Sequence, residues 1–313
     1  MRVTLLAGGT GGTKLAHGFA MLDDVELTVI ANVGDDAEMH GLHVSPDIDA
    51  LLYTLAGLID DERGWGVRGD THTAHAMLER LGAPTWFSLG DADLATNLER
   101  TRRLRTGERL TDATAAMASA LGIRARILPA TDDRYRTRLE TDQGVLDFQD
   151  YFVRRRQEPE VRAVHFDAEA RPTAEVLDAT ENADFVVIGP SNPFVSIGPT
   201  LELAGVQDAL RATEARKIAV SPIIGGRALK GPADRMLTSM GHEPSAVGVA
   251  RLYAGLIDRF VLDEADAALA PDVEKLGMTA EVLSTVMASD ADRRALAEAL
   301  IGTARVDRDM LTM

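Results

Sequence analysis

Cysteine is absent from the 313 residues of this sequence, and no stretch approaches the roughly 18 continuous apolar residues that a membrane span requires. The missing cysteines exclude disulfides, thiolate nucleophiles and zinc–thiolate sites. The N-terminus enters a strand-like segment without the charged leader and apolar core of a secretory signal. We therefore expect a cytoplasmic protein that has no membrane partner.

Positive charge is also scarce. Lysine and arginine number 33 against 49 aspartates and glutamates, which gives a formal net charge of −16. This charge argues against diffuse attraction to nucleic acid or to an anionic membrane. An anionic small molecule would have to be held locally, by backbone amides, a few arginines and a metal ion. The predicted ligands are therefore small molecules.

Apolar runs that alternate with helical patterns indicate an α/β fold. At 45% apolar content the chain has enough core for one large domain over residues 1–313. The alternation predicts a doubly wound, mostly parallel, Rossmann-like sheet, and the mainly helical stretch from about 47 to 121 predicts a cap-like insertion after the second strand. The expected strands are Arg2–Ala7, Glu26–Asn32, Thr85–Leu89, Ile123–Leu128, Val161–Phe166, Asp184–Gly189, Lys217–Ser221 and Arg259–Leu262.

Two segments stand apart from this alternation. Arg136–Thr141 and Val145–Gln149 flank Asp142-Gln143-Gly144, which has the residues of a hairpin turn. The tail from Ala280 onward has the pattern of two amphipathic helices, which suit packing or an oligomer surface. We expect a homodimer.

The first expected strand ends in a glycine-rich turn, Gly8-Gly9-Thr10-Gly11-Gly12-Thr13-Lys14, and a helical pattern follows from Lys14 to Met21. Glycines let the backbone approach an anion, and a helix N-terminus directs free N–H groups toward it. Thr10, Gly11, Gly12 and Thr13 are therefore predicted to hold a phosphate. A purely structural tight turn is the alternative.

Known phosphate-binding patterns fit this turn poorly. The dinucleotide fingerprint needs a third glycine where Lys14 stands, and a Walker A loop needs Gly-Lys followed by Ser or Thr. The turn is similar to the glycine-rich signature of sugar nucleotidyltransferases, but no lysine between Lys14 and Lys217 can supply that family's downstream Pro-Lys. A nucleotidyltransferase is therefore disfavoured.

Aspartates gather after the second expected strand, at Asp35, Asp36, Asp47 and Asp49. Ser45-Pro46 has the residues of a helix start, so Asp47 and Asp49 would also suit the positive end of a helix dipole. Four carboxylates so close together repel unless a cation or protonation relieves them. Oxygen ligands that leave room for substrate phosphates favour Mg²⁺. Asp36 and Asp47 are the predicted metal ligands, with Asp35 in reserve because adjacent aspartates in an extended turn point apart.

Small polar loops follow two later strands. Gly189-Pro190-Ser191-Asn192-Pro193 follows the apolar run Phe185–Ile188, and Ser221-Pro222-Ile223 follows Ile218–Val220. A single loop of this kind could merely end a strand, but several at one edge of a sheet suggest a site. Ser191 and Asn192 are predicted to hold the nucleoside side of a ligand.

Taken in order, these blocks resemble the 2-phospho-L-lactate transferase family of coenzyme F-420 biosynthesis. The likeness covers nearly the whole chain and includes Gly8-Gly9-Thr10-Gly11, Ser45-Pro46-Asp47-Ile48-Asp49, Trp65-Gly66, Leu89-Gly90-Asp91-Ala92-Asp93, Phe148-Gln149, Gly189-Pro190-Ser191-Asn192-Pro193 and Ser221-Pro222-Ile223. The resemblance implies Mg²⁺-dependent transfer of a phospholactyl or phosphoenolpyruvyl group from a guanosine diphosphate-linked donor to the ribityl hydroxyl of the deazaflavin Fo, with release of GMP.

The resemblance also implies roles for single residues. Asp49 matches an Fo-contacting aspartate, and we predict that it orients the attacking hydroxyl or accepts its proton. Ser88 matches a second Fo contact that is lysine in some relatives, and Asp91 is placed among the substrate-binding residues. The family commonly has arginine and histidine where this chain has Ala92 and Asn97. Compensation by Arg100 or Arg103, about one and two helical turns further on, is expected.

A second hypothesis comes from another class of protein. A regulatory family of related fold binds UDP-sugars through a similar glycine-rich turn without catalysis. Trp65-Gly66, Gly90-Asp91 and Gly189–Pro193 favour the transferase.

Overall fold

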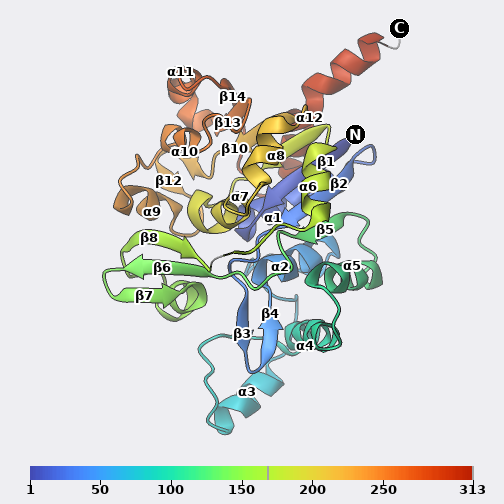
Figure 1. Cartoon of the computed structure of the whole chain (residues 1–313), viewed down its shortest axis with the longest axis vertical. Coiled ribbons are helices and arrows are strands. Elements are labelled where there is room, and N and C mark those ends of the chain that lie inside the picture. Colours follow the sequence, from blue (N-terminus) through green and yellow to red (C-terminus); the bar gives the residue numbers. More distant parts are fainter. Residues whose placement is uncertain (168, 312–313) are drawn as a thin grey trace.

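The computed structural model of the chain describes residues 1–167 and 169–311, and its centre is a seven-stranded sheet in the order β14-β13-β10-β9-β1-β2-β5 (Figure 1). Every neighbouring pair in this sheet is parallel. The strands are β1 Arg2–Ala7, β2 Glu26–Ala31, β5 Arg126–Pro129, β9 Phe185–Ile188, β10 Arg216–Val220, β13 Arg259–Asp263 and β14 Thr279–Leu283.

Apolar residues on both faces explain why these segments form central strands. Residues 3–7 of β1 and all of β9 are buried, which is typical of a parallel sheet covered by helices on both sides. The pairing of β1 with β2 runs without interruption from Arg2 opposite Glu26 to Ala7 opposite Ala31. Both strands consequently end at the same edge of the sheet.

Helices cover this sheet. Helix α1 packs against α2 and the C-terminal α12, and α6 packs against α8. Among the described residues, no helix is both long and apolar enough to cross a bilayer. The helices are α1 Gly9–Ala20, α2 Pro46–Leu55, α3 Thr73–Arg80, α4 Asp91–Arg105, α5 Leu110–Ala120, α6 Ala174–Glu181, α7 Gly198–Leu201, α8 Val206–Ala212, α9 Ala233–Ser239, α10 Ala246–Leu252, α11 Ala270–Glu274 and α12 Asp290–Leu311, with short turns η1 Asp150–Arg154, η2 Pro193–Ile197 and η3 Glu264–Leu269.

Between β2 and β5 the chain forms α2 to α5 and a hairpin of β3 (Ala37–Met39) and β4 (Leu42–Val44). Its turn has positive φ at His40 and Gly41, as tight two-residue hairpins require. In Figure 1 the hairpin, α3 and α4 extend below the central sheet. Two smaller pairings lie elsewhere: the antiparallel sheet β7-β6-β8, of β6 Thr137–Thr141, β7 Gly144–Asp147 and β8 Val161–Phe166, and the ribbon of β11 Ile223–Ile224 and β12 Arg227–Ala228.

The predicted fold class is confirmed, whereas two predictions about elements are wrong and one predicted strand lies outside the central sheet. Thr85–Leu89 forms no strand and is a partly buried loop that leads into α4. Val161–Phe166 is a strand, but it pairs antiparallel with β6 outside the central sheet. The tail is not two helices, because residues 279–283 form β14 and one helix follows. Parallel pairing with β13 decides the conformation of that segment more than its own pattern does.

The chain order reverses beside β1, which positions the candidate site. β2 and β5 extend the sheet on one side of β1, and β9, β10, β13 and β14 extend it on the other. The turns after β1 and β9 therefore separate at the carboxyl edge, the place where doubly wound sheets bind ligands.

Candidate functional site

The glycine-rich turn is the first turn of α1. The helix begins at Gly9, so the prediction that it begins at Lys14 is wrong by five residues. Gly9 adopts φ +63°, a conformation that favours glycine, and its N–H donates to Asp47 Oδ1 at 2.7 Å. A carboxylate of α2 thus already caps the N-terminus of α1, where an anionic ligand is expected to bind.

Close packing is a second reason for glycine in this turn. A Cβ atom at Gly11 would overlap with the Pro190 carbonyl oxygen, and one at Gly12 would lie 2.9 Å from Ser191 Oγ. The Thr13 hydroxyl turns back to donate to the Gly9 carbonyl at 2.9 Å. The structural reading of the turn therefore accounts for Gly11, and the phosphate roles of Thr10 to Thr13 stay predictions.

Ser191 differs from its neighbour Asn192. Ser191 Oγ is buried and finds no hydrogen-bond partner among the described residues. The Asn192 side chain instead caps η2: its Oδ1 accepts from the N–H groups of Phe194 and Val195, and its Nδ2 donates to Met236 Sδ. Ser191 thus keeps a free polar atom beside the glycine-rich turn.

Three buried aspartates gather at the end of β2. Asp36 Oδ2 lies 2.8 Å from His43 Nε2 and accepts from Ser45 Oγ at 2.9 Å. Asp47 Oδ2 accepts from Asn32 Nδ2 at 2.9 Å, on the side opposite Gly9. Asp35 Oδ1 and Asp36 Oδ1 are buried and have no partner among the described residues.

Burial of Asp35 and Asp47 disfavours their ionised forms. It raises the pKa of Asp35 well above its ordinary value, and the negative charges of Asp47 and Asp36 raise it further. Burial also raises the pKa of Asp47 to about 6, against the hydrogen bonds from Gly9 and Asn32. We name Asp35, Asp36 and Asp47 the acidic cluster. A cation bound there would relieve the repulsion.

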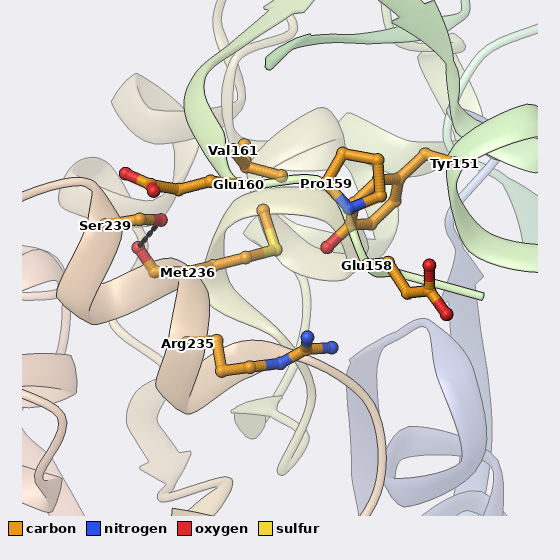
Figure 2. Close-up of a pocket in the computed structure, with 8 residues that line it drawn as sticks. All are labelled: Tyr151, Glu158, Pro159, Glu160, Val161, Arg235, Met236 and Ser239. Atoms are coloured by element: carbon orange, nitrogen blue, oxygen red, sulfur yellow. Dashed lines mark hydrogen bonds between the residues drawn. The ribbon is translucent and has the colours of Figure 1, made fainter. Parts of the chain in front are cut away.

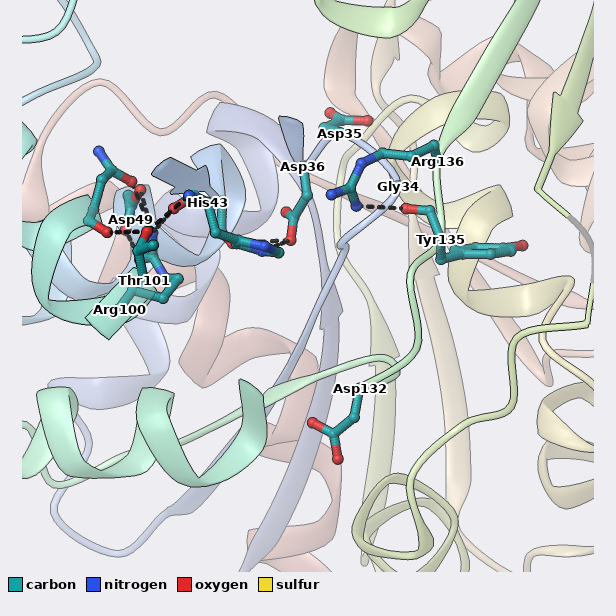
Figure 3. A network of polar contacts seen from close by, with 12 residues as sticks. Gly34, Asp35, Asp36, His43, Asp49, Arg100, Thr101, Asp132, Tyr135 and Arg136 are labelled. Carbon is teal, nitrogen blue, oxygen red and sulfur yellow. Dashed lines mark hydrogen bonds and ion pairs between the residues drawn. The ribbon is translucent and has the colours of Figure 1, made fainter. Parts of the chain in front are cut away.

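Asp49 lies apart from the acidic cluster, because its carboxylate binds Arg100 (Figure 3). The Arg100 side chain has no exposed surface, and its Nη1 also donates to Asn97 Oδ1 at 2.8 Å and to the His43 carbonyl at 3.3 Å. Burial raises the pKa of Asp49, and the guanidinium of Arg100 opposes this shift. Asp49 is therefore held in one position by α4.

The predicted compensating arginines are both engaged. Arg100 binds Asp49, and Arg103 is paired with Glu99 at 2.8 Å and with Glu108 at 2.9 Å. Asn97 holds the network together, since its Nδ2 donates to the Asp93 carbonyl at 2.9 Å. Neither arginine presents a free guanidinium to a donor.

Two predicted substrate-binding residues lie at the start of α4 or just before it. Ser88 is half-buried in the loop before α4. Asp91 accepts from Thr71 Oγ1 at 2.6 Å and from the N–H groups of Thr73 and Ala74, which caps α3 and lowers the Asp91 pKa to about 2. The substrate roles of Ser88 and Asp91 stay predictions, and the structure adds a stabilising role for Asp91.

Two residues near the acidic cluster were missed by the sequence argument. His43 approaches Asp36 because the β3–β4 hairpin turns it back, and Arg136 precedes β6 and points toward the same turn (Figure 3). In the sequence, a histidine seven residues after Asp36 belongs to no recognisable motif, so no signal pointed to His43. The signal for Arg136 was its place at the start of a predicted hairpin.

A glycine-rich first turn of a helix, set beside buried carboxylates where a parallel sheet reverses its order, defines the chain as a Rossmann-like α/β protein with a candidate site at the carboxyl edge. Comparison with known families is more specific. The family model described as 2-phospho-L-lactate transferase CofD matches residues 3–301. The chain belongs to this family.

Individual relatives agree with the family match. The 2-phospho-L-lactate transferase of Methanothermobacter thermautotrophicus is 41% identical over 302 residues, which cover 96% of this chain and 97% of that protein. The phosphoenolpyruvate transferase of Nocardia farcinica is 40% identical over 289 residues, 87% of each chain. A solved structure of a UPF0052 family protein from Bacillus halodurans has a TM-score of 0.68 at 18% identity and covers 96% of this chain and 98% of that one, which supports the fold alone.

Proposed function

We propose that the chain transfers a phospholactyl or phosphoenolpyruvyl group from a guanosine diphosphate-linked donor to the terminal ribityl hydroxyl of Fo and releases GMP. Membership of the family supports transferase activity in coenzyme F-420 biosynthesis. The two kinds of relative, one named for phospholactate and one for phosphoenolpyruvate, leave the acid of the donor to experiment. The non-catalytic UDP-sugar hypothesis is disfavoured by the names of these relatives.

The observation that carries the proposal is the pair of buried carboxylate oxygens, Asp35 Oδ1 and Asp36 Oδ1, that lack a partner in the described part of the chain. Unpartnered carboxylate oxygens of this kind suit a hard cation. No three His, Cys, Asp or Glu side chains of the described residues form a ready metal-binding group. Mg²⁺ commonly takes one or two carboxylates and completes its shell with water and substrate phosphates. Asp36 and Asp47 would hold it, with Asp35 in reserve.

The remaining assignments belong to the same proposal. The first turn of α1 and Ser191 would bind phosphate from the side of the sheet edge. Mg²⁺, when bound, would neutralise charge on the diphosphate. Asp49 would orient the ribityl hydroxyl or accept its proton while Arg100 fixes its carboxylate. The proton of the hydroxyl would leave as the new phosphodiester forms and GMP departs.

One experiment tests both the reaction and the donor. Purified protein is mixed with Fo, Mg²⁺ and each guanosine diphosphate-linked donor, carrying lactate, enolpyruvate or glycerate, and products are identified by mass spectrometry. We expect one phosphodiester of Fo and one GMP per turnover. Asp36→Asn should abolish product, whereas the exposed Asp23→Asn should not. Absence of product with every donor, together with binding of a UDP-sugar, would establish the regulatory alternative.

A further inference from the structure

Arg136 is a half-buried arginine that has no acidic partner among the residues described by the structure. It immediately precedes β6, and its Nη1 donates to the Tyr135 carbonyl at 3.0 Å. In the described chain, no carboxylate oxygen lies within 4.0 Å of the Arg136 guanidinium, which is the distance limit for an ion pair. Arg138, two residues further along, is paired with Asp147 at 2.6 Å and with Asp167 at 3.6 Å. The ion pairs of the β7-β6-β8 sheet therefore do not account for Arg136, whose guanidinium has no acidic partner in the described chain.

The backbone ties Arg136 to the acidic cluster. Thr137 N–H donates to the Gly34 carbonyl at 2.8 Å, so the start of β6 is joined to the turn that carries Asp35 and Asp36. Figure 3 shows the Arg136 side chain reaching from that point toward this turn. Burial lowers the pKa of Arg136, and among charged groups Asp36 opposes this shift most strongly.

Unpartnered polar atoms mark the same place. Thr137 Oγ1 is buried without a hydrogen-bond partner in the described structure and lies against Gly34, and Asp35 Oδ1 and Asp36 Oδ1 are in the same condition. A half-buried cation and the unpartnered oxygens of two buried carboxyl groups thus face one another across a turn, too far apart to form an ion pair. Leaving such groups unpaired is unfavourable. A ligand that presents an anion to Arg136 and shares a cation with the aspartates would satisfy both.

A nucleoside diphosphate with its metal ion has this charge distribution. Planar guanidinium groups bind two phosphate oxygens at once, and such charge-assisted bonds are among the strongest hydrogen bonds in proteins. Arg136 also supplies the positive charge that Arg100 and Arg103 do not, because both of those are bound to carboxylates.

We propose that Arg136 binds a phosphate of the nucleoside diphosphate at the edge of the acidic cluster and is the cation through which the chain recognises its donor. This inference rests on the proposed function, since it concerns the donor of the same reaction. The inference adds to the candidate site a residue that belongs neither to the glycine-rich turn nor to the acidic cluster.

The test is direct binding of GDP in the presence of Mg²⁺, measured calorimetrically without turnover. Loss of one charge-assisted contact of about 1.5–3 kcal/mol predicts that Arg136→Ala weakens GDP binding roughly 10- to 150-fold. Arg136→Lys should recover part of this loss because it keeps the charge without the planar fork. Arg134→Ala is the matched control: Arg134 is two residues away and exposed, and GDP should bind this variant as tightly as the wild type.

Fo binding, followed by deazaflavin fluorescence, separates the possible results. We expect Arg136→Ala to bind Fo like the wild type, which also shows that it is folded. Wild-type affinity of Arg136→Ala for GDP, with turnover of the wild type intact, would overturn the inference and leave the proposed function standing. A wild-type protein that binds neither GDP nor Fo would overturn both.

Discussion

The buried carboxylate of Asp49 and those of the acidic cluster differ in how their charge is balanced. Asp49 meets the buried guanidinium of Arg100, which also binds Asn97. Within the described residues, the acidic cluster of Asp35, Asp36 and Asp47 has only neutral or histidine donors, namely Gly9 N–H, Asn32, Ser45 and His43. The charge of Asp49 is balanced within the described chain, whereas the charge of the acidic cluster is not.

This difference separates buried charges that stabilise the fold from buried charges that can bind a ligand. A buried ion pair that satisfies its own charges connects α2 to α4 and requires no ligand. A buried cluster without a counter-cation is unfavourable by itself and becomes favourable when a cation binds. The difference predicts that perturbing the Arg100 pair affects folding first, and that perturbing the acidic cluster affects ligand binding first.

Removal of divalent cations should have the largest effect. We expect EDTA to abolish turnover and Mg²⁺ to restore it, because the acidic cluster would otherwise repel the donor diphosphate. Melting curves with GDP should show a higher melting temperature with Mg²⁺ than without it. Full activity after exhaustive chelation would remove the metal from the proposed function.

Arg100→Leu should have the next largest effect, on stability. It leaves Asp49 buried without its counterion, at a cost of about 3–5 kcal/mol in the free energy of unfolding. Chemical denaturation measures this loss. Arg100→Leu combined with Asp49→Leu should recover most of it, since an apolar pair replaces both charges. If the double variant is no more stable than Arg100→Leu alone, the pair is not the compensated unit described above.

Asp49→Asn should lower turnover by at least ~10²-fold, the lower range for a positioned acid–base group. The structure adds a stability loss, because the buried Arg100 loses a charged partner. Turnover is measured well below the melting temperature, so that unfolding does not contribute. Near-normal turnover under these conditions would exclude Asp49 from the chemistry. Its role would then be the ion pair with Arg100.

Asp35→Asn should stabilise the metal-free protein. The folded-state pKa of Asp35 is raised, so its contribution to stability is fully present below about pH 4 and is lost as pH rises through that raised pKa. Asparagine removes this loss, so the variant should gain about 1–3 kcal/mol at neutral pH and nothing near pH 4. Melting temperatures across this pH range measure the gain. A constant difference at all pH values would contradict it.

Ala92→Arg should have the smallest effect. Ala92 is exposed at the start of α4, so an arginine there is expected to change stability by less than about 0.5 kcal/mol. The Michaelis constant for the donor should stay unchanged if Arg136 supplies the recognition. A clearly lower constant in Ala92→Arg would show instead that this position reaches the donor. Asn97→His is the contrasting variant. Asn97 is fully buried and accepts a hydrogen bond from Arg100, so we expect that the site does not accommodate the larger imidazole ring.

The outcome at individual elements shows which signals in the sequence were sufficient. The prediction of β1 matched residue for residue, since a continuous apolar run that ends in glycine has few other structures available. The start of α2 at Ser45-Pro46 was also correct, although Ser45 uses its hydroxyl on Asp36 rather than as a helix cap. Thr85–Leu89 failed because its apolar residues pack in a loop with no neighbouring strand.

The sequence by itself determined the alternating α/β pattern, the glycine-rich turn and the presence of several aspartates after β2, because these depend on local residue order. Only the tertiary structure decided which aspartates are neutralised. Asp49 meets Arg100 across 51 positions of chain, and Arg136 faces Asp36 because Thr137 pairs with Gly34. Charge balance is a property of atoms brought together from distant segments, so no local pattern could have distinguished the balanced charge of Asp49 from the unbalanced charge of the acidic cluster.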